Sequence, residues 1–265
     1  MSGSLRRIRN VVSKEWALMS SSFASLLYVV LFPLLITGQA LLIIWLVARF
    51  VPVGEAMTAM VQSGEADAAS WSAVDSLRLL LVRQFDFFLL IVPAMIANVF
   101  STQSIVEEKV TRTLEPLLAT PVRTWELVAG KALSGAVPAV ISTWVCAGAF
   151  LGALYGLGWG FLVPAALDAT WLICVLALAP AVAVLSFVLG VIGSSRAADA
   201  KGAQNVSIVI FLPIVALIVV QVTGLVWFSP AMMGAVAGGF FLMTGGMVVA
   251  AVRLFARESI VIRWR

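Results

Sequence analysis

Six stretches of this chain are apolar over a length that can cross a lipid bilayer. A helix needs roughly 20 apolar residues to span about 30 Å of hydrocarbon. Soluble domains carry charges on about a quarter of their residues, whereas this chain of 265 residues is 62% hydrophobic and 11% charged. The sequence therefore predicts an all-α, polytopic membrane protein with six transmembrane helices, at residues 25–47, 87–104, 132–154, 169–193, 206–223 and 231–252.

The basic residues predict the orientation, because Lys and Arg are retained on the cytoplasmic side of membrane proteins. If the N-terminus is inside, three of the 17 Lys and Arg residues fall on the outer side, namely Arg49, Arg78 and Arg83. The other fourteen are then cytoplasmic. We therefore expect a multi-pass protein of the cell (inner) membrane with both termini in the cytoplasm. The net charge of +4 indicates contact with anionic lipid rather than with nucleic acid.

Residues 1–22 precede the membrane domain at 23–265 and form a separate element. Their apolar side chains recur at spacings of three and four, and basic residues occupy most of the remaining positions. This pattern predicts an amphipathic helix in the headgroup region. It either braces the first span or serves only as a positively charged anchor. The apolar positions are Leu5, Ile8, Val12, Trp16 and Met19.

The segment between the first two spans, residues 49–86, is predicted to be an outside loop. Within it Val74, Leu77, Leu81 and Phe85 form a second stripe with helical spacing. We expect this part to pack on the membrane surface or against the spans, either as a lid over an exit or as a loop without a transport role.

Glycines and cysteines in the spans are interpreted as packing residues. Glycines four apart allow close helix approach, and we expect intramolecular packing, in preference to contacts between two copies, at Gly148, Gly152, Gly156, Gly160, Gly234 and Gly238. Cys146 and Cys174 are expected to pack as small apolar residues. No metal site is predicted, since the chain contains no histidine.

The charged segment 105–131, between the second and third spans, has the pattern of a helical contact surface. Glu108 and Arg112 are four apart in the order that favours an ion pair on a helix. Thr113 is a good N-cap, Glu115 suits a first turn, and a helix at 114–119 would then present its leucines to a partner. Thr120 followed by Pro121 predicts the start of a further helix.

This segment resembles the first intracellular loop of type-2 ATP-binding-cassette (ABC) transporter permeases. The resemblance is carried by Thr113-Leu114-Glu115, Leu117-Leu118, Thr120-Pro121 and Gly130-Lys131, and it extends to the layout of the whole chain. It implies a cytoplasmic coupling helix that contacts the ATPase. The residues assigned to this coupling are Glu107, Glu108, Arg112, Thr113, Leu114, Glu115, Leu117, Leu118, Thr120 and Pro121.

The resemblance also implies partners, because the chain lacks an ATPase motif of its own. Gly130-Lys131 is followed by Ala132 instead of Ser or Thr, and Trp125 stands where a phosphate-binding loop begins with glycine. The chain is therefore predicted to be an exporter permease, not an enzyme, and to hold no cofactor itself. ATP and Mg would be bound by a separate ATPase subunit, present in two copies, beside a second permease copy that is identical or closely related.

In the same resemblance the second and fifth spans face the partner copy and line the substrate path. Neutral polar and aromatic side chains on these spans would bind an amphipathic molecule, or they would hydrogen-bond between helices of one bundle. Both interpretations remain open. The residues are Asn98, Phe100, Gln103, Asn205, Phe211 and Gln221.

Two other classes compete with a permease. Glu107-Glu108 followed by Arg112 resembles a motif of the prenyl-protein endopeptidases, but that family also uses histidine, which this chain lacks. A secondary transporter or channel would place ionisable groups at mid-membrane. Here Asp86, Asp168 and Lys131 are expected near the ends of spans, which favours the permease.

Overall fold

The described part of the chain folds into helices. The computed structural model describes residues 2–21, 23–50, 72–110, 124–196, 209, 211–223 and 228–256. The α-helices are α1 (Ser2–Ser21), α2 (Phe23–Phe50), α4 (Ala73–Leu89), α5 (Ile91–Val110), α7 (Thr124–Gly156), α8 (Val163–Ala166), α9 (Ala169–Ile173), α10 (Ala179–Arg196), α12 (Phe211–Val222) and α13 (Pro230–Ala256). A 3₁₀ turn, η2 (Gly160–Leu162), precedes α8, and a π-helical turn, η3 (Cys174–Leu178), joins α9 to α10.

Five helical stretches in this described part are long and apolar enough to cross a membrane. Four of them correspond to the first, third, fourth and sixth predicted spans, and the second span is confirmed in a longer form. The predicted fifth span is not confirmed as such, since its described counterpart α12 has 12 residues. The five stretches are Leu26–Phe50, Ala73–Ser104, Trp125–Gly156, Ala169–Gly193 and Pro230–Arg253.

Both ends of the segment 49–86, predicted to be an outside loop, are helical. Arg49 belongs to α2, and α4 begins at Ala73 after Ser72, whose hydroxyl accepts a hydrogen bond from the Asp75 amide at 3.1 Å. The predicted helical stripe is confirmed as one side of α4, with Leu77 and Phe85 buried. Residues 51–71 lie outside the described part.

The second span is interrupted by a turn at Leu90, where α4 ends and α5 begins. Pro93 lies in the first turn of α5 and has no amide hydrogen to donate back to α4. A proline also lies at a change of helix type in the fourth span, where the π-helical turn η3 ends at Leu178 and Pro180 is the second residue of α10. The prolines therefore divide two spans into shorter helical pieces.

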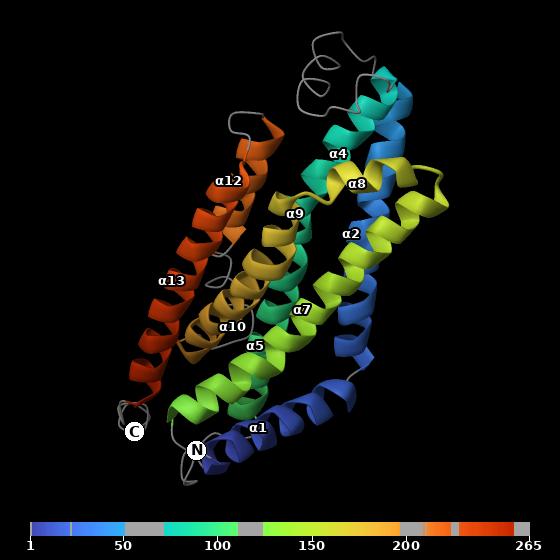
Figure 1. Cartoon of the computed structure of the whole chain (residues 1–265). Helices are drawn as coiled ribbons and strands as arrows, with labels where there is room; N and C mark the ends of the chain where they lie inside the picture. Colours follow the sequence, from blue (N-terminus) through green and yellow to red (C-terminus); the bar gives the residue numbers. More distant parts are fainter. Residues whose placement is uncertain are drawn as a thin grey trace.

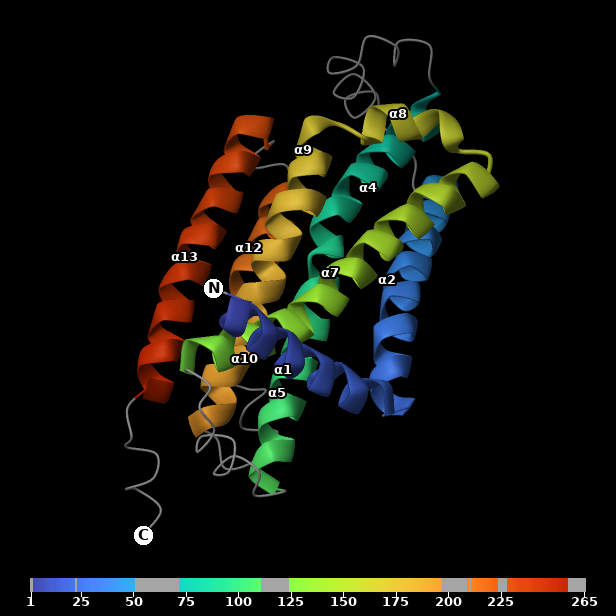
Figure 2. The same ribbon diagram turned by 60° about the horizontal axis from the view of Figure 1, so that its bottom comes forward.

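Helix α10 is the centre of the bundle and packs against α5, α7 and α13 (Figures 1 and 2). In the fourth span 67% of the most apolar stretch is buried, compared with 17% for α2 and 22% for α13. Those two helices form opposite edges of the bundle (Figure 1). Helix α1 lies across one end, close to the start of α7, while α8 lies at the other end.

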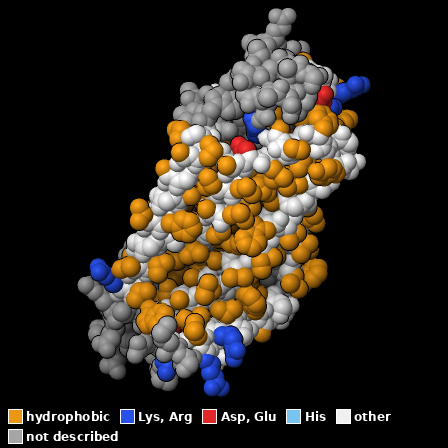
Figure 3. Space-filling view, in the orientation of Figure 1, with side chains coloured by type: hydrophobic (Ala, Val, Ile, Leu, Met, Phe, Trp, Pro, Cys, Tyr) orange, Lys and Arg blue, Asp and Glu red, His pale blue; other side chains and the backbone are white. Residues whose placement is uncertain are grey.

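Hydrophobic side chains cover the middle of the face seen in Figure 3, and the visible charged side chains lie toward its two ends. Many of the exposed side chains on the outer helices are large and apolar, such as Leu34 on α2 and Leu242 on α13. Large exposed apolar surfaces are unfavourable in water but are matched to lipid. This distribution agrees with a bundle that spans a bilayer.

The prediction of intramolecular packing is wrong for five of the six glycines. Gly148, Gly152 and Gly156 on α7 are exposed, and no described atom lies within 4 Å of the position that a Cβ would take. The same holds for Gly234 and Gly238 on α13. These glycines face outward. A spacing of four therefore shows that glycines share one face of a helix, but it does not show that another helix packs on that face.

Close helix contacts occur at other glycines. A Cβ on Gly190 of α10 would overlap Ser101 of α5, and one on Gly135 of α7 would overlap the ring of Phe187. The absence of a side chain at these positions lets α10 approach both neighbours. Cys146 and Cys174 are buried and unbridged, and they lie in different parts of the core.

Candidate functional site: a polar anchor between α1, α5 and α7

Helix α1 is fixed to the bundle through a buried ionic cluster, which we call the anchor: Glu15 of α1, Ser104 of α5 and Lys131 of α7. Lys131 Nζ lies 3.3 Å from Glu15 Oε1 and donates a hydrogen bond to Ser104 Oγ at 2.8 Å. Ser104 Oγ donates in turn to Glu15 Oε2 at 2.9 Å. The Lys131 and Glu15 side chains are 5% and 6% exposed. Each charge is thus paired and hydrogen-bonded away from solvent.

A second contact joins the N-terminal part of α1 to the start of α7. Glu126 is fully buried, and its two carboxylate oxygens accept hydrogen bonds from Ser4 Oγ at 2.6 Å and from Arg7 Nη1 at 3.3 Å. The Arg7 side chain is 44% exposed. An acid in the first turn of a helix is also favoured by the helix dipole. Glu126 therefore stabilises the start of α7 while it binds α1.

Gly130 explains how the two helices come close enough for these contacts. A Cβ at this position would lie 2.9 Å from Cβ of Val11, so a larger residue would push α1 away from α7. One turn further along α7, the Ser134 carbonyl accepts a hydrogen bond from Trp16 Nε1 at 3.0 Å. The Gly130-Lys131 pair thus has a physical role: its glycine admits α1 and its lysine pairs with Glu15.

Sequence reasoning missed the anchor, although a signal for it was present. Glu15 follows Val12 by three residues and precedes Met19 by four, so it lies on the apolar side of α1. The other charged residues of α1 are basic. An acid on the apolar side of an otherwise basic helix indicates a buried partner. The identity of that partner required the tertiary structure.

The anchor residues Ser104 and Lys131 bracket the predicted coupling segment, 105–131. Helix α5 continues to Val110, beyond the apolar stretch of the second span, and its last turns contain Glu107 and Glu108. The other predicted coupling residues, Arg112, Thr113, Leu114, Glu115, Leu117, Leu118, Thr120 and Pro121, lie outside the described residues. Their contact with an ATPase stays a prediction.

The residues predicted to line a substrate path lie in different environments. Asn98 and Phe100 on α5 are buried at 7% and 3% exposure, and Phe100 belongs to the core beside Phe187. Gln103 is exposed, and Phe211 is partly buried on α12. Gln221 is 7% exposed. Asn205 lies outside the described residues.

Two of these residues carry a buried polar atom whose hydrogen bonding is incomplete. Within the described residues no donor reaches Asn98 Oδ1 or Gln221 Oε1. Buried carbonyl oxygens are normally paired with protein, water or ligand. Asn98 lies beside Ser101 in the contact between α5 and α10.

The expectation that Asp86 lies near the end of a span is wrong. Asp86 lies on α4 within the second span and is 5% exposed. Lys131 lies near the start of its span, as expected, where it is buried and paired with Glu15. Asp168, in contrast, caps α9, where its carboxylate accepts a hydrogen bond from the Trp171 amide at 2.7 Å. The start of the second span was predicted too late in the chain, because the span begins with α4 at Ala73, and Asp86 therefore lies inside it.

The end of the bundle opposite α1 is closed by contacts between α4 and the segment around α8. Arg78 pairs with Asp75 at 2.7 Å, and its guanidinium carbon lies 4.8 Å above the ring of Trp159. Arg83 donates a hydrogen bond to the Ala165 carbonyl at 2.9 Å. Two of the three basic residues assigned to the outer side therefore stabilise this cap.

Five apolar helices of membrane length show that the chain is a multi-pass membrane protein. At one end of the bundle, ion pairs hold the charged helix α1 against α7. Residues 9–257 match the family described as ABC-2 family transporter protein, and the chain belongs to this family. It is accordingly an ABC transporter permease, the membrane subunit and not the ATPase. No match was found among curated proteins or among solved structures.

Proposed function

We propose that this chain is the membrane subunit of an ABC exporter and that a separate ATPase subunit drives it through the segment 105–131. The observation that carries the proposal is the anchor. It joins α1 to Ser104, just before that segment, and to Lys131, at its end. A force applied to the segment would reach α1, α5 and α7 together. The whole end of the bundle would then move as one unit.

The burial of the anchor supports this mechanism. Two opposite charges in a low-dielectric site interact strongly only in a narrow range of geometry, and a buried pair of this kind resists sliding of one helix past another. Helix α1 would lie at the cytoplasmic membrane surface and transmit the push to α2. Rocking of two permease copies would open a shared cavity to each side in turn.

We further propose that the chain works with a second copy, identical or closely related, and with two ATPase subunits that bind ATP and Mg. The exposed apolar faces of α2 and α13 leave room for such a copy. The substrate path would follow the second and fifth spans, where Gln103 is exposed and Phe211 is partly buried. A transporter independent of ATP is the alternative, and family membership favours the ATP-driven class.

Coupling is tested at the predicted ATPase contact. Leu117→Asp and Glu115→Arg are expected to leave the permease folded in the membrane. They should weaken its association with the ATPase by about tenfold or more, since a few buried side chains contribute most of the binding energy of an interface. Co-purification and substrate-stimulated ATP turnover measure the effect. Leu117→Met, which keeps an apolar side chain of similar size, is the control. Unchanged association in both charged variants would contradict the proposal.

The orientation is tested by labelling single cysteines in intact cells with a membrane-impermeant reagent. Cysteines replacing Asp67 and Ser70 are expected to react from outside, while cysteines replacing Arg112 and Arg263 should react only after the membrane is opened. The native Cys146 and Cys174 are buried, so their background is expected to be low. Labelling of position 112 from outside would invert the topology.

A further inference from the structure

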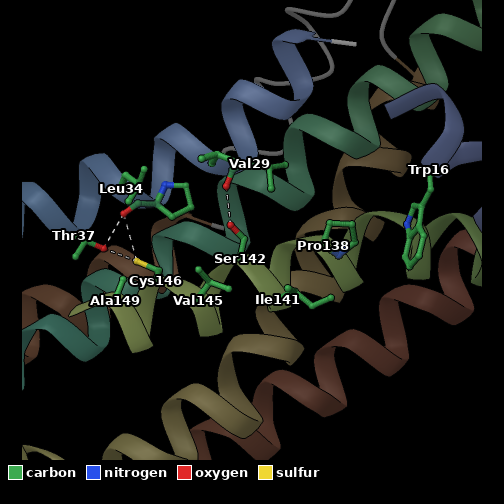
Figure 4. A pocket seen from close by; sticks show the side chains of 12 residues that line it. Trp16, Val29, Leu34, Thr37, Pro138, Ile141, Ser142, Val145, Cys146 and Ala149 are labelled. Carbon is green, nitrogen blue, oxygen red and sulfur yellow. Dashed lines mark hydrogen bonds between the residues drawn. The ribbon is translucent and has the colours of Figure 1, made fainter. Parts of the chain in front are cut away.

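An apolar groove of about 440 Å³ lies between α1, α2 and α7 (Figure 4). On α2 its lining positions run from Val29 to Thr37, and on α7 they run from Pro138 to Ala149. These two helices approach each other at the end opposite α1 and diverge toward α1 (Figure 1). The side chain of Trp16 closes the wide end of the groove.

A hydrogen bond joins the two walls of the groove, and the lining hydroxyl groups leave little free polar surface inside it. Ser142 Oγ of α7 donates to the Val29 carbonyl of α2 at 2.8 Å, while Thr37 Oγ1 donates within α2 to the Pro33 carbonyl at 2.9 Å. Both hydroxyl groups are therefore satisfied by α2. Trp16 is likewise held by its hydrogen bond to Ser134. The groove presents a fixed, largely apolar interior to an occupant.

The surroundings of the groove are hydrocarbon, because both walls belong to candidate membrane spans. The rim is apolar and exposed: Val30 is 60%, Ile141 51% and Val145 65% exposed. No exposed acid or base lies among the lining residues. A molecule that binds in the groove therefore reaches it from the lipid and places an apolar group inside it.

The shape of the groove selects one kind of apolar part. From Pro138 to Ala149, α7 rises by about 16 Å, so the groove of about 440 Å³ is long in comparison with its width. Its length and its apolar lining suit a single extended alkyl chain.

The charge of α1 selects the other part of the occupant. Arg6, Arg7, Arg9 and Lys14 have exposed side chains, whereas Glu15, the acid of α1, is buried against Lys131. A basic surface beside the membrane attracts anionic lipid by about 1 kcal/mol per Lys or Arg. We propose that the groove binds one acyl chain of an anionic phospholipid whose headgroup lies against the basic surface of α1.

The test uses the full-length protein in vesicles of phosphatidylcholine containing a minor fraction of phosphatidylglycerol that carries a photoreactive group on one acyl chain. Crosslinked peptides are then mapped by mass spectrometry. Labels are expected to concentrate on residues 29–37 and 138–149. Ala149→Trp should fill the groove and reduce labelling there about fivefold or more. Leu242→Trp, at a position on α13 that is 80% exposed, is the matched control and should leave labelling unchanged.

A second comparison tests the headgroup. With a photoreactive phosphatidylcholine, or with Arg9→Gln and Lys14→Gln combined, labelling of the groove should fall severalfold. If Ala149→Trp does not fold, Ile141→Trp replaces it, because that rim position is half exposed. Even labelling of α2, α7 and α13, equal effects of Ala149→Trp and Leu242→Trp, or copy-to-copy crosslinks in place of lipid labels would each overturn the proposal.

Discussion

Lys131→Met is expected to lower the free energy of unfolding by about 3–5 kcal/mol, because it leaves the Glu15 carboxylate buried without its counter-charge. The loss exceeds that of a typical hydrogen bond, since Glu15 is 6% exposed and Ser104 alone must then satisfy it. Unfolding of the purified protein in mixed micelles, followed by tryptophan fluorescence, measures the change. The midpoint should shift to clearly lower denaturant.

Two further variants separate an ion-pair effect from a packing effect. Combining Lys131→Met with Glu15→Leu replaces both charges with apolar groups, and most of the stability is expected to return. Arg6→Met removes an exposed positive charge from α1 and should have little effect. A single Lys131→Met variant as stable as the native protein would show that the pair does not hold α1 in place.

Gly190→Val is expected to destabilise the bundle by about 3 kcal/mol or more, because its new side chain would overlap Ser101 across the most extensive helix contact in the described chain. The backbones of α5 and α10 would have to separate, and the neighbouring contact at Asn98 would open with them. Thermal unfolding and the yield of folded protein in the membrane measure the effect.

The matched control for this variant is Gly152→Val on α7. No described atom lies within 4 Å of the Cβ position at Gly152, so we expect near-native stability in lipid. Both substitutions add the same side chain to a glycine in a span. Equal destabilisation of the two variants would mean that helix propensity, and not the contact between α5 and α10, determines the loss.

The membrane class could be predicted from the sequence because hydropathy and helical period are local properties. Runs of apolar residues identified counterparts for five spans, and the stripe from Val74 to Phe85 identified a helix that the structure confirms as α4. The Gly130-Lys131 pair was recognised as part of a family pattern. These features depend on a residue and its near neighbours in the chain, so no knowledge of packing was needed.

The candidate site required contacts between distant parts of the chain. Glu15 and Lys131 are 116 residues apart, and no local pattern assigns one to the other. The same reason explains the glycine error: a spacing of four defines a face of α7, but only the neighbouring helix decides whether Gly135 or Gly152 is covered. Asp86, predicted near the end of a span, lies inside one, because the helical stretch begins at Ala73. The sequence alone determined that the chain crosses a membrane and which segments are helical, whereas the tertiary structure decided which charges are buried together, because burial depends on which helix faces meet.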